Sequence, residues 1–223
     1  MHNVVERLIA IQSEIKELLI KNNSQNKELN IIIVCKTFSM NKILPLIDAG
    51  HIHFGENKVQ EAELKWKEVK QRYSNIKLHM VGKLQTNKVR TALKIFDYVH
   101  SVDNYKLAEK ITKYEKELNK RIKTFVQVNV GEESQKSGIS PKNVNQFVDY
   151  CKNSFRLNII GLMCLPPIND NPEKYFLHLN QLRDQTDLCH LSMGMSSDYQ
   201  TAIKCGSTFL RIGSRILGEK NTN

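Results

Sequence analysis

The sequence lacks long hydrophobic runs. No uninterrupted apolar segment in its 223 residues approaches the roughly 20 residues that cross a bilayer. Neither end combines a positively charged segment, an apolar stretch and a small-residue cleavage site, which together mark a secretory signal. We therefore expect a cytoplasmic protein that makes no membrane contact.

Cysteine is sparse, and its pattern argues against disulfides and metal sites. The five cysteines are odd in number, include no C-x-x-C pair and lie mostly in or beside apolar runs; they are Cys35, Cys151, Cys164, Cys189 and Cys205. Such residues are typical of free thiols in a reducing compartment. His51 and His53 alternate along one segment without a carboxylate or cysteine in a recognisable ligand spacing, so we predict no metal ion.

Proline and glycine are few, with five and ten residues respectively. The chain contains no proline-rich linker, low-complexity tract or close internal repeat that would mark a boundary between domains. Chains of this length commonly form one domain. We predict that residues 1–223 form a single domain.

Acidic residues are outnumbered by basic ones, 23 against 33, which gives a net charge of +10. Such an excess can indicate a nucleic-acid partner. Here the lysines are spread along helix-like segments and do not form one block, which favours a solvated surface. We predict no nucleic-acid partner, whereas a small phosphate ligand agrees with this charge.

The chain is organised around residues 31–36, the run I-I-I-V-C-K. Continuous apolar and β-branched residues without glycine or proline are typical of a parallel strand that is buried on both faces. The run ends in Lys36. A lysine at this place either extends into solvent or meets a ligand at the end of a barrel. The run alone leaves both interpretations open.

Apolar runs alternate with helix-like segments along the rest of the chain. After residues 31–36, the expected strands are 51–54, 78–82, 98–102, 124–130, 159–165, 190–195 and 208–213. The expected helices are 3–21, a short helix capped by Asn41 and ended by Gly50, 58–69, 87–95, 104–119, 141–151, 172–184 and 198–204. Strands that alternate with helices form parallel sheets. Eight such units predict an α/β protein, a (β/α)8 TIM barrel with an extra N-terminal helix.

In such a barrel, the residues that follow the strands lie together at one end. The loop at 193–198 offers two hydroxyls at the start of a helix, and Arg211–Ser214 offers a cation, a close backbone approach at Gly213 and another hydroxyl. These groups bind phosphate, although helix capping by residues 197–198 explains part of the pattern. A phosphate site opposite Lys36 suits pyridoxal 5'-phosphate (PLP), whose aldehyde forms a Schiff base with an amine.

Several motifs resemble those of the pyridoxal phosphate homeostasis protein family. They are Val34-Cys35-Lys36-Thr37, His53-Phe54-Gly55-Glu56-Asn57, the loop from Val81 to Lys88, Gly161-Leu162-Met163, and the blocks Leu191 to Ser196 and Arg211-Ile212-Gly213. The resemblance implies an alanine-racemase-like barrel that binds PLP. The sequence departs from the family where Ser214 stands in place of the common threonine, a change that keeps the hydroxyl.

The resemblance also implies roles for six residues. Lys36 carries the Schiff base, Ser196, Gly213 and Ser214 hold the phosphate, Arg211 contacts the pyridine nitrogen, and Asn57 lies beside the ring. The implied function is intracellular PLP homeostasis, in which the protein stores and delivers the cofactor and limits free PLP. Apo-PLP enzymes are the candidate recipients.

The expected site favours a carrier over an enzyme. PLP enzymes that generate carbanions usually place a carboxylate beside the pyridine nitrogen, whereas the expected neighbour here is Arg211, a permanent cation. Alanine racemases add a second acid/base group from a C-terminal domain across a dimer interface, and this sequence shows no such domain. We therefore expect a non-catalytic monomer; the alternative is a PLP-dependent amino-acid racemase of low activity.

Overall fold

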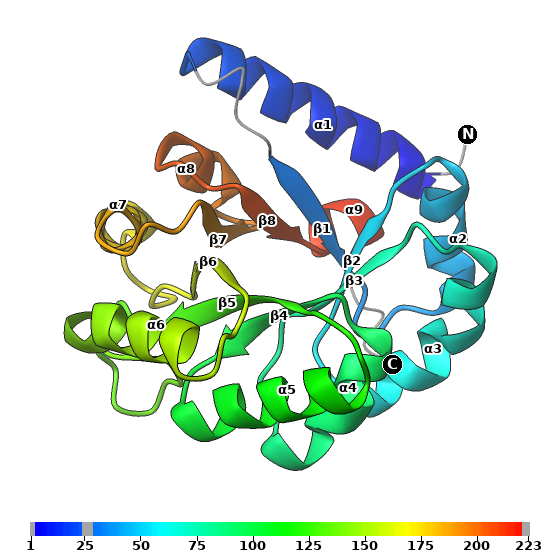
Figure 1. The fold of residues 1–223 in the computed structure, drawn as a ribbon. Coiled ribbons are helices and arrows are strands. Elements are labelled where there is room, and N and C mark those ends of the chain that lie inside the picture. Colours follow the sequence, from blue (N-terminus) through cyan, green and yellow to red (C-terminus); the bar gives the residue numbers. More distant parts are fainter. Residues whose placement is uncertain (1–2, 24–28, 220–223) are drawn as a thin grey trace.

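The computed structural model describes residues 3–23 and 29–219. Eight parallel strands form a closed barrel in which each strand pairs with the next, and the last pairs with the first (Figure 1). The strands are β1 (Asn30–Val34), β2 (His53–Glu56), β3 (Lys77–Met80), β4 (Tyr98–Val102), β5 (Lys123–Val128), β6 (Ile159–Cys164), β7 (His190–Met195) and β8 (Phe209–Ile212). The predicted (β/α)8 barrel is confirmed.

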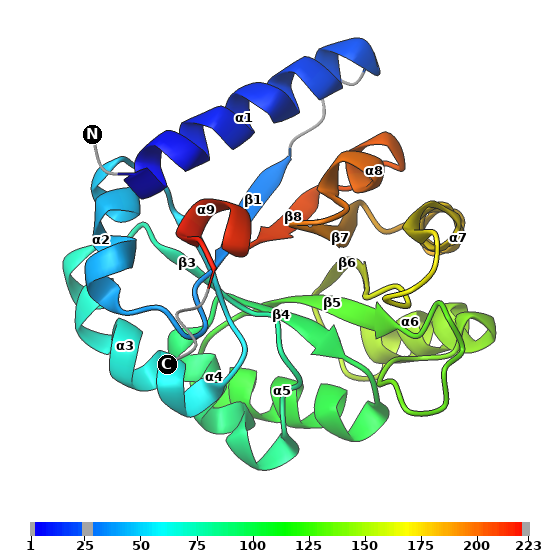
Figure 2. The ribbon, with the colours of Figure 1, turned by 180° about the vertical axis from the view of Figure 1, so that it is seen from behind.

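Helices surround the barrel on its outer face (Figures 1 and 2). They are α1 (Asn3–Lys21), α2 (Met40–Asp48), α3 (Val59–Arg72), α4 (Val89–Ile95), α5 (Tyr105–Glu117), α6 (Val144–Asn153), α7 (Pro172–Asp184), α8 (Tyr199–Lys204) and α9 (Ser214–Leu217), with short 3₁₀ turns η1 (Thr86–Lys88) and η2 (Pro141–Asn143). Within residues 3–23 and 29–219, no helix is long and apolar enough to cross a membrane.

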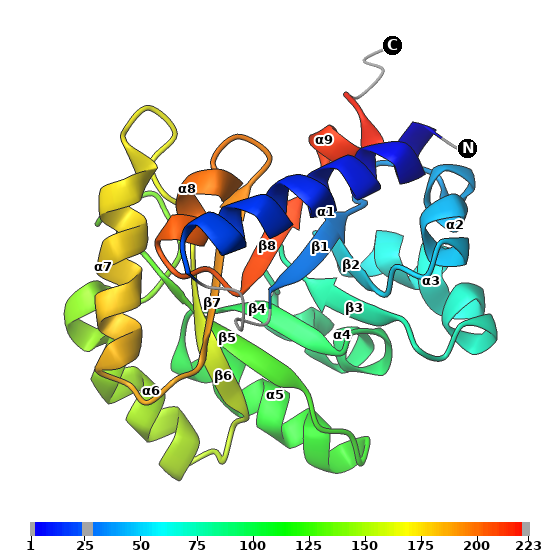
Figure 3. The same ribbon diagram turned by 90° about the horizontal axis from the view of Figure 1, so that it is seen from above.

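The extra N-terminal helix, α1, lies across the side of the barrel where the first and last strands meet (Figure 3). Val4, Leu8, Ile11 and Ile15 recur at helical spacing and are buried. The helix contacts α2, α8 and α9. Glu14 connects it to the C-terminal elements, because its carboxylate accepts a hydrogen bond from Tyr199 at 2.5 Å.

Two details near the first strand differ from the sequence-based expectation. Strand β1 ends at Val34, so Lys36 follows the strand instead of ending it. The Phe38 amide donates to the Cys35 carbonyl at 2.8 Å, which closes a turn around Lys36. Helix α2 begins at Met40, which places Asn41 inside the helix and not at its cap. Of the polar connector expected at 22–30, residues 24–28 lie outside the described residues.

The interior of the barrel holds an apolar cluster separate from the larger core between strands and helices. This cluster consists of Ile32, Tyr98, Phe125, Met163 and Phe209. Two buried histidines lie among these side chains: His79 stacks on Tyr98 and His100 stacks on Phe125. The interior is therefore packed, as expected for a barrel of this size, but it is not wholly apolar.

Burial of histidine predicts that the fold is sensitive to acid. Burial lowers the pKa of His51 to about 4, and it lowers the pKa values of His79 and His100 well below the ordinary range. Between the unfolded-state pKa of about 6.5 and these lower folded-state values, the unfolded chain binds more protons, so stability falls as the pH drops. His51 alone accounts for a loss on the order of 3 kcal/mol by about pH 4. Urea unfolding across this range measures the loss.

The His51→Gln variant is the control for this prediction, because glutamine does not titrate. Its free energy of unfolding should fall less steeply than that of the wild type between about pH 6.5 and about pH 4. The two proteins should keep a constant difference above about pH 7, where the wild-type imidazole is neutral in both states. Parallel profiles over the whole range would contradict the prediction.

Candidate functional site

A pocket of about 520 Å³ opens at the C-terminal ends of the strands. All six residues predicted to bind the cofactor line it: Lys36, Asn57, Ser196, Arg211, Gly213 and Ser214. The wall also contains Ser197, the second hydroxyl of the loop 193–198, and residues to which the sequence reasoning gave no role at the site, namely Val34, Phe38, Val81, Leu165, Met195 and Gly218. The volume lies in the ordinary range for small-molecule sites.

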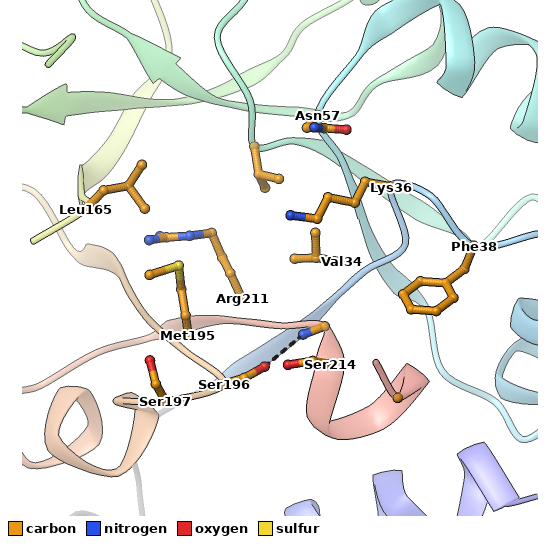
Figure 4. Close-up of a pocket in the computed structure, with 13 residues that line it drawn as sticks. Val34, Lys36, Phe38, Asn57, Leu165, Met195, Ser196, Ser197, Arg211 and Ser214 are labelled. Atoms are coloured by element: carbon orange, nitrogen blue, oxygen red, sulfur yellow. Dashed lines mark hydrogen bonds between the residues drawn. The ribbon is translucent and has the colours of Figure 1, made fainter. Parts of the chain in front are cut away.

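Lys36 enters the pocket from the turn that follows β1. Its side chain extends toward the centre of the pocket, on the side opposite Ser196 and Ser214, and the amine points toward Arg211 (Figure 4). The residue is exposed to solvent. A ligand in the pocket can therefore reach the amine without a change in the barrel.

Lys65 of α3 holds this turn in place. Its ammonium donates to the carbonyl oxygen of Lys36 at 2.9 Å and to that of Cys35 at 3.3 Å. It also pairs with the carboxylate of Glu56 at 2.9 Å, and the indole of Trp66 donates to the same oxygen at 2.9 Å. The Glu56 side chain is fully buried. A largely buried ion pair thus fixes the backbone that carries Lys36.

The opposite wall of the pocket consists of hydroxyls and backbone groups of Ser196, Gly213 and Ser214, which we call the cradle. The Gly213 amide donates to the Ser196 hydroxyl at 3.3 Å, which links the loops after β7 and β8 (Figure 4). A Cβ atom on Gly213 would lie 3.2 Å from the Val34 carbonyl oxygen, so a side chain here would crowd β1. Ser214 begins α9, in which the amides of Ile216 and Leu217 donate to the Gly213 carbonyl, so those of Ser214 and Arg215 are the ones without an intrahelical acceptor. These groups suit a phosphate.

The loop after β7 departs from the expected helix capping. Asp198 makes no side-chain cap to α8. Instead, its carboxylate accepts a hydrogen bond from the Met195 amide at 2.6 Å. The carboxylate therefore tightens the loop that carries Ser196, which lies between these two residues in the chain.

Arg211 lies in the floor of the pocket and is only 5% exposed. Its guanidinium donates to the carbonyl oxygen of Ser192 at 2.7 Å and to that of Cys164 at 2.8 Å. It also donates to the Ser192 hydroxyl at 2.6 Å. Burial lowers the pKa of this arginine from its ordinary value. All three acceptors are neutral, so the cation keeps its full charge for a ligand.

Asn57 supplies a polar atom with no protein partner. Its Oδ1 is buried and accepts no hydrogen bond from the residues that the structure describes. Gly82 packs against the Asn57 backbone so closely that a Cβ atom on it would lie 2.3 Å from the Asn57 carbonyl oxygen. A buried acceptor without a partner in a pocket wall indicates a missing ligand donor. The Asn57 Oδ1 atom and the cradle together fit a phosphorylated ring compound.

The pocket has few groups that can move protons. Among the described residues that line it, Lys36 and Arg211 alone are titratable. Two cations without a lining carboxylate suit an anionic ligand. No second acid/base group therefore lies beside the Lys36 amine among the described residues that line the pocket.

The histidines considered as metal ligands have other partners. His51 lies before β2, and its Nε2 is 2.9 Å from the carbonyl oxygen of His53. His53 bonds His79, ring to ring, at 2.9 Å. Within the described part of the chain, no three His, Cys, Asp or Glu side chains are grouped so that they could hold a metal ion.

Fold and site together define an alanine-racemase-like barrel. The model of the family "Alanine racemase, N-terminal domain" matches residues 10–221. A pyridoxal phosphate homeostasis protein of Aquifex aeolicus is 33% identical to this chain, with 98% of this chain and 99% of that protein covered. One of Haemophilus influenzae is 31% identical, with 98% and 97% covered. The chain belongs to the alanine racemase N-terminal domain family and, within it, to the pyridoxal phosphate homeostasis proteins.

Solved structures agree with this assignment. PipY of Synechococcus elongatus without PLP matches with a TM-score of 0.85 at 31% identity, covering 97% of this chain and 100% of that chain. PipY with PLP bound matches with a TM-score of 0.77 at 32% identity, covering 92% and 100%. An alanine racemase of Clostridium difficile has a TM-score of 0.71 at 14% identity, with 99% and 58% covered, and shows a common fold only.

Proposed function

We propose that this protein binds pyridoxal 5'-phosphate through a Schiff base on Lys36 and serves intracellular PLP homeostasis. In this role it stores and delivers the cofactor and limits the amount of free PLP. The names of the relatives and the PLP-bound form of PipY support the proposal. The observation that carries it is the arrangement of the pocket, where one amine lies opposite a cradle of hydroxyls and backbone amides.

Each proposed contact agrees with the chemistry of the pocket. PLP supplies an aldehyde that condenses with an amine and a pyridine ring that accepts electrons. The Lys36 amine would hold the aldehyde as a C=N bond, with one water released as that bond replaces C=O. Ser196, Gly213 and Ser214 would hold the phosphate. Arg211 would contact the pyridine nitrogen, and Asn57 would lie beside the ring.

The absence of a second acid/base group supports a carrier over an enzyme. Racemisation by two bases needs one group on each face of the substrate carbon. Of the described residues that line the pocket, Lys36 and Arg211 are the only titratable ones, and Arg211 stays protonated, so the lining offers no pair of acid/base groups. A PLP-dependent racemase of low activity is the second candidate. Assays of racemase and transaminase activity decide between them: robust turnover lost in Lys36→Ala would overturn the carrier.

Three further expectations stay predictions. They are that residues 1–223 form one domain, that the protein is a cytoplasmic monomer, and that apo-PLP enzymes receive the cofactor.

Transfer of PLP to an apo-enzyme is measured as the recovery of the enzyme's activity after mixing with the loaded protein. Recovery no faster than with an equal amount of free PLP would contradict delivery by contact.

The direct test of the proposed function locates the modified residue. Purified cofactor-free protein is mixed with one equivalent of PLP, and its absorption spectrum is recorded before and after reduction with borohydride. Mass spectrometry of the peptides should find the reduced adduct on Lys36. An unchanged spectrum, or an adduct mainly on another residue, would contradict the proposal.

The phosphate cradle gives a second prediction. Ser196→Ala or Ser214→Ala should each weaken PLP binding by roughly tenfold, because each variant removes one hydrogen bond to a charged group. Binding of pyridoxal, which lacks the phosphate, should not change. Ser154→Ala is the matched control, since Ser154 is exposed at the end of α6 and does not line the pocket. Equal losses for PLP and pyridoxal would show that the serines do not bind the phosphate.

A further inference from the structure

A hydrogen-bonded chain of three histidines leads through the barrel interior to the pocket. His53 of β2 bonds His79 of β3, His79 bonds His100 of β4, and His100 bonds the hydroxyl of Ser192 of β7, each at 2.9 Å. The chain ends at Arg211 of β8, which donates to the Ser192 hydroxyl at 2.6 Å. Strands β4 and β7 are not neighbours, so the link between His100 and Ser192 crosses the interior.

Packing alone does not account for these polar residues. His79, His100 and Ser192 are fully buried. The ring centroids of His79 and Tyr98 are 4.1 Å apart, and those of His100 and Phe125 are 4.3 Å apart. Apolar side chains would fill the same space without hydrogen-bond partners, whereas buried polar groups are costly unless they are satisfied. The chain satisfies both ring nitrogens of His79 and of His100.

Arg211 sets the direction of the chain. Because its guanidinium donates to the Ser192 hydroxyl oxygen, the hydroxyl hydrogen is directed away from the cation, toward Nδ1 of His100. His100 then carries its proton on Nε2 and donates to Nδ1 of His79, which donates in the same way to His53. Burial lowers the pKa values of His79 and His100, so both rings are neutral near pH 7. This order assigns the Nε2–H tautomer to both.

The arginine depends on this support because no carboxylate holds it. Within residues 3–23 and 29–219, its hydrogen-bond acceptors are two carbonyl oxygens and one hydroxyl. A carboxylate in contact would fix the guanidinium but would also neutralise it. An uncharged hydrogen-bonded chain fixes the side chain and leaves its charge available in the pocket.

We infer that His100 is a positioning residue for Arg211, acting through Ser192, and that His79 and His53 hold His100 in the required tautomer. The inference rests on the proposed function, in which Arg211 lies at the pyridine nitrogen. A fixed cationic donor at that atom disfavours its protonation. Breaking the chain would free the guanidinium to rotate, and the ring nitrogen would then be protonated more easily.

The first test uses the protein without cofactor. Proton–nitrogen NMR of the side chains should report the Nε2–H tautomer for His79 and His100. His100→Leu should change the side-chain signals of Arg211 and speed their hydrogen exchange by roughly tenfold, because the Ser192 hydroxyl loses its partner. His100→Asn is the matched variant. Its carboxamide can keep the bond to Ser192 while losing that to His79, so the Arg211 signals should stay near those of the wild type.

The second test uses protein loaded with PLP that carries an isotope label at the pyridine nitrogen. In the wild type, the nitrogen signal should stay that of an unprotonated ring between about pH 6 and about pH 9. In His100→Leu it should titrate within this range, and the affinity for PLP should fall by roughly tenfold. Ser192→Ala changes the packing of the interior less than His100→Leu does. It should shift the titration of the ring nitrogen and the affinity for PLP in the same directions as His100→Leu.

The outcomes separate positioning from a structural role. Unchanged Arg211 signals in His100→Leu and Ser192→Ala would overturn the inference, even if both variants lost thermal stability. A ring-nitrogen profile in His100→Leu that matches the wild type would also overturn it. If the protein bound no PLP, the proposed function would fail, and the NMR of the cofactor-free protein would still decide whether His100 positions Arg211.

Discussion

Replacing Lys36 with methionine is expected to weaken PLP binding by roughly 10²- to 10³-fold, because the covalent bond is lost and only the phosphate and ring contacts remain. Methionine keeps the length of the side chain without the amine. An absorbance titration near stoichiometric concentrations measures the affinity. Borohydride reduction at one equivalent of PLP should no longer modify the turn after β1.

Lys42→Met is the matched control for this variant. Lys42 lies on α2, and its ammonium is 4.8 Å from the centre of the ring of Phe38, a residue that lines the pocket. The control therefore removes one positive charge close to the site but leaves Lys36 intact, and PLP affinity should stay within about threefold of the wild type. Equal losses in the two variants would mean that Lys36 contributes charge and not a covalent bond.

The barrel could be predicted because its signals are local. The run Ile31–Val34 is apolar at every position, as a strand buried on both faces requires, and it forms β1. Helix α1 has the predicted bounds, Asn3–Lys21, because its apolar residues recur at helical spacing. Eight such strand signals were sufficient to predict the closed sheet that the structure contains.

Strand β2 shows where local signals mislead. The alternation from His51 to Phe54 predicted a strand there, but β2 begins at His53 and continues through Gly55 and Glu56, which are poor strand formers. A Cβ atom on Gly55 would lie 2.9 Å from the Ile32 side chain of β1, so a larger residue here would crowd the neighbouring strand. Contacts with the neighbouring strand therefore determine the bounds of β2.

The residues that support the site could not be predicted, because their partners are distant in sequence. Each of His53, His79 and His100 lies on a different strand, and only the closed barrel brings their rings into a chain with Ser192. Their one local signal is a histidine beside apolar residues in each of three strands. The residues expected to touch the ligand were easier to predict, since they lie at the ends of strands, where barrels place their sites.

Lys65→Met is expected to destabilise the fold by about 3–5 kcal/mol, because it leaves the fully buried Glu56 carboxylate without its cation. Burial already raises the pKa of Glu56, against the opposing effects of Trp66 and Lys65, and the variant should raise it further. The turn that carries Lys36 also loses two hydrogen bonds to its carbonyl groups. Urea unfolding measures the stability, and the rate of reaction with PLP measures the effect on the turn.

Two comparisons separate the buried pair from the general effect of removing a lysine. Lys58 and Glu61 form an exposed ion pair at the start of α3. The free energy of unfolding of Lys58→Met should stay within about 0.5 kcal/mol of the wild-type value. Adding Glu56→Gln to Lys65→Met should recover part of the stability, because a neutral amide costs less to bury than an unpaired carboxylate. The turn would still lack its ammonium, so reaction at Lys36 should stay slow. Recovery of both stability and rate in the double variant would mean that Lys65 serves only to neutralise Glu56 and does not hold the turn.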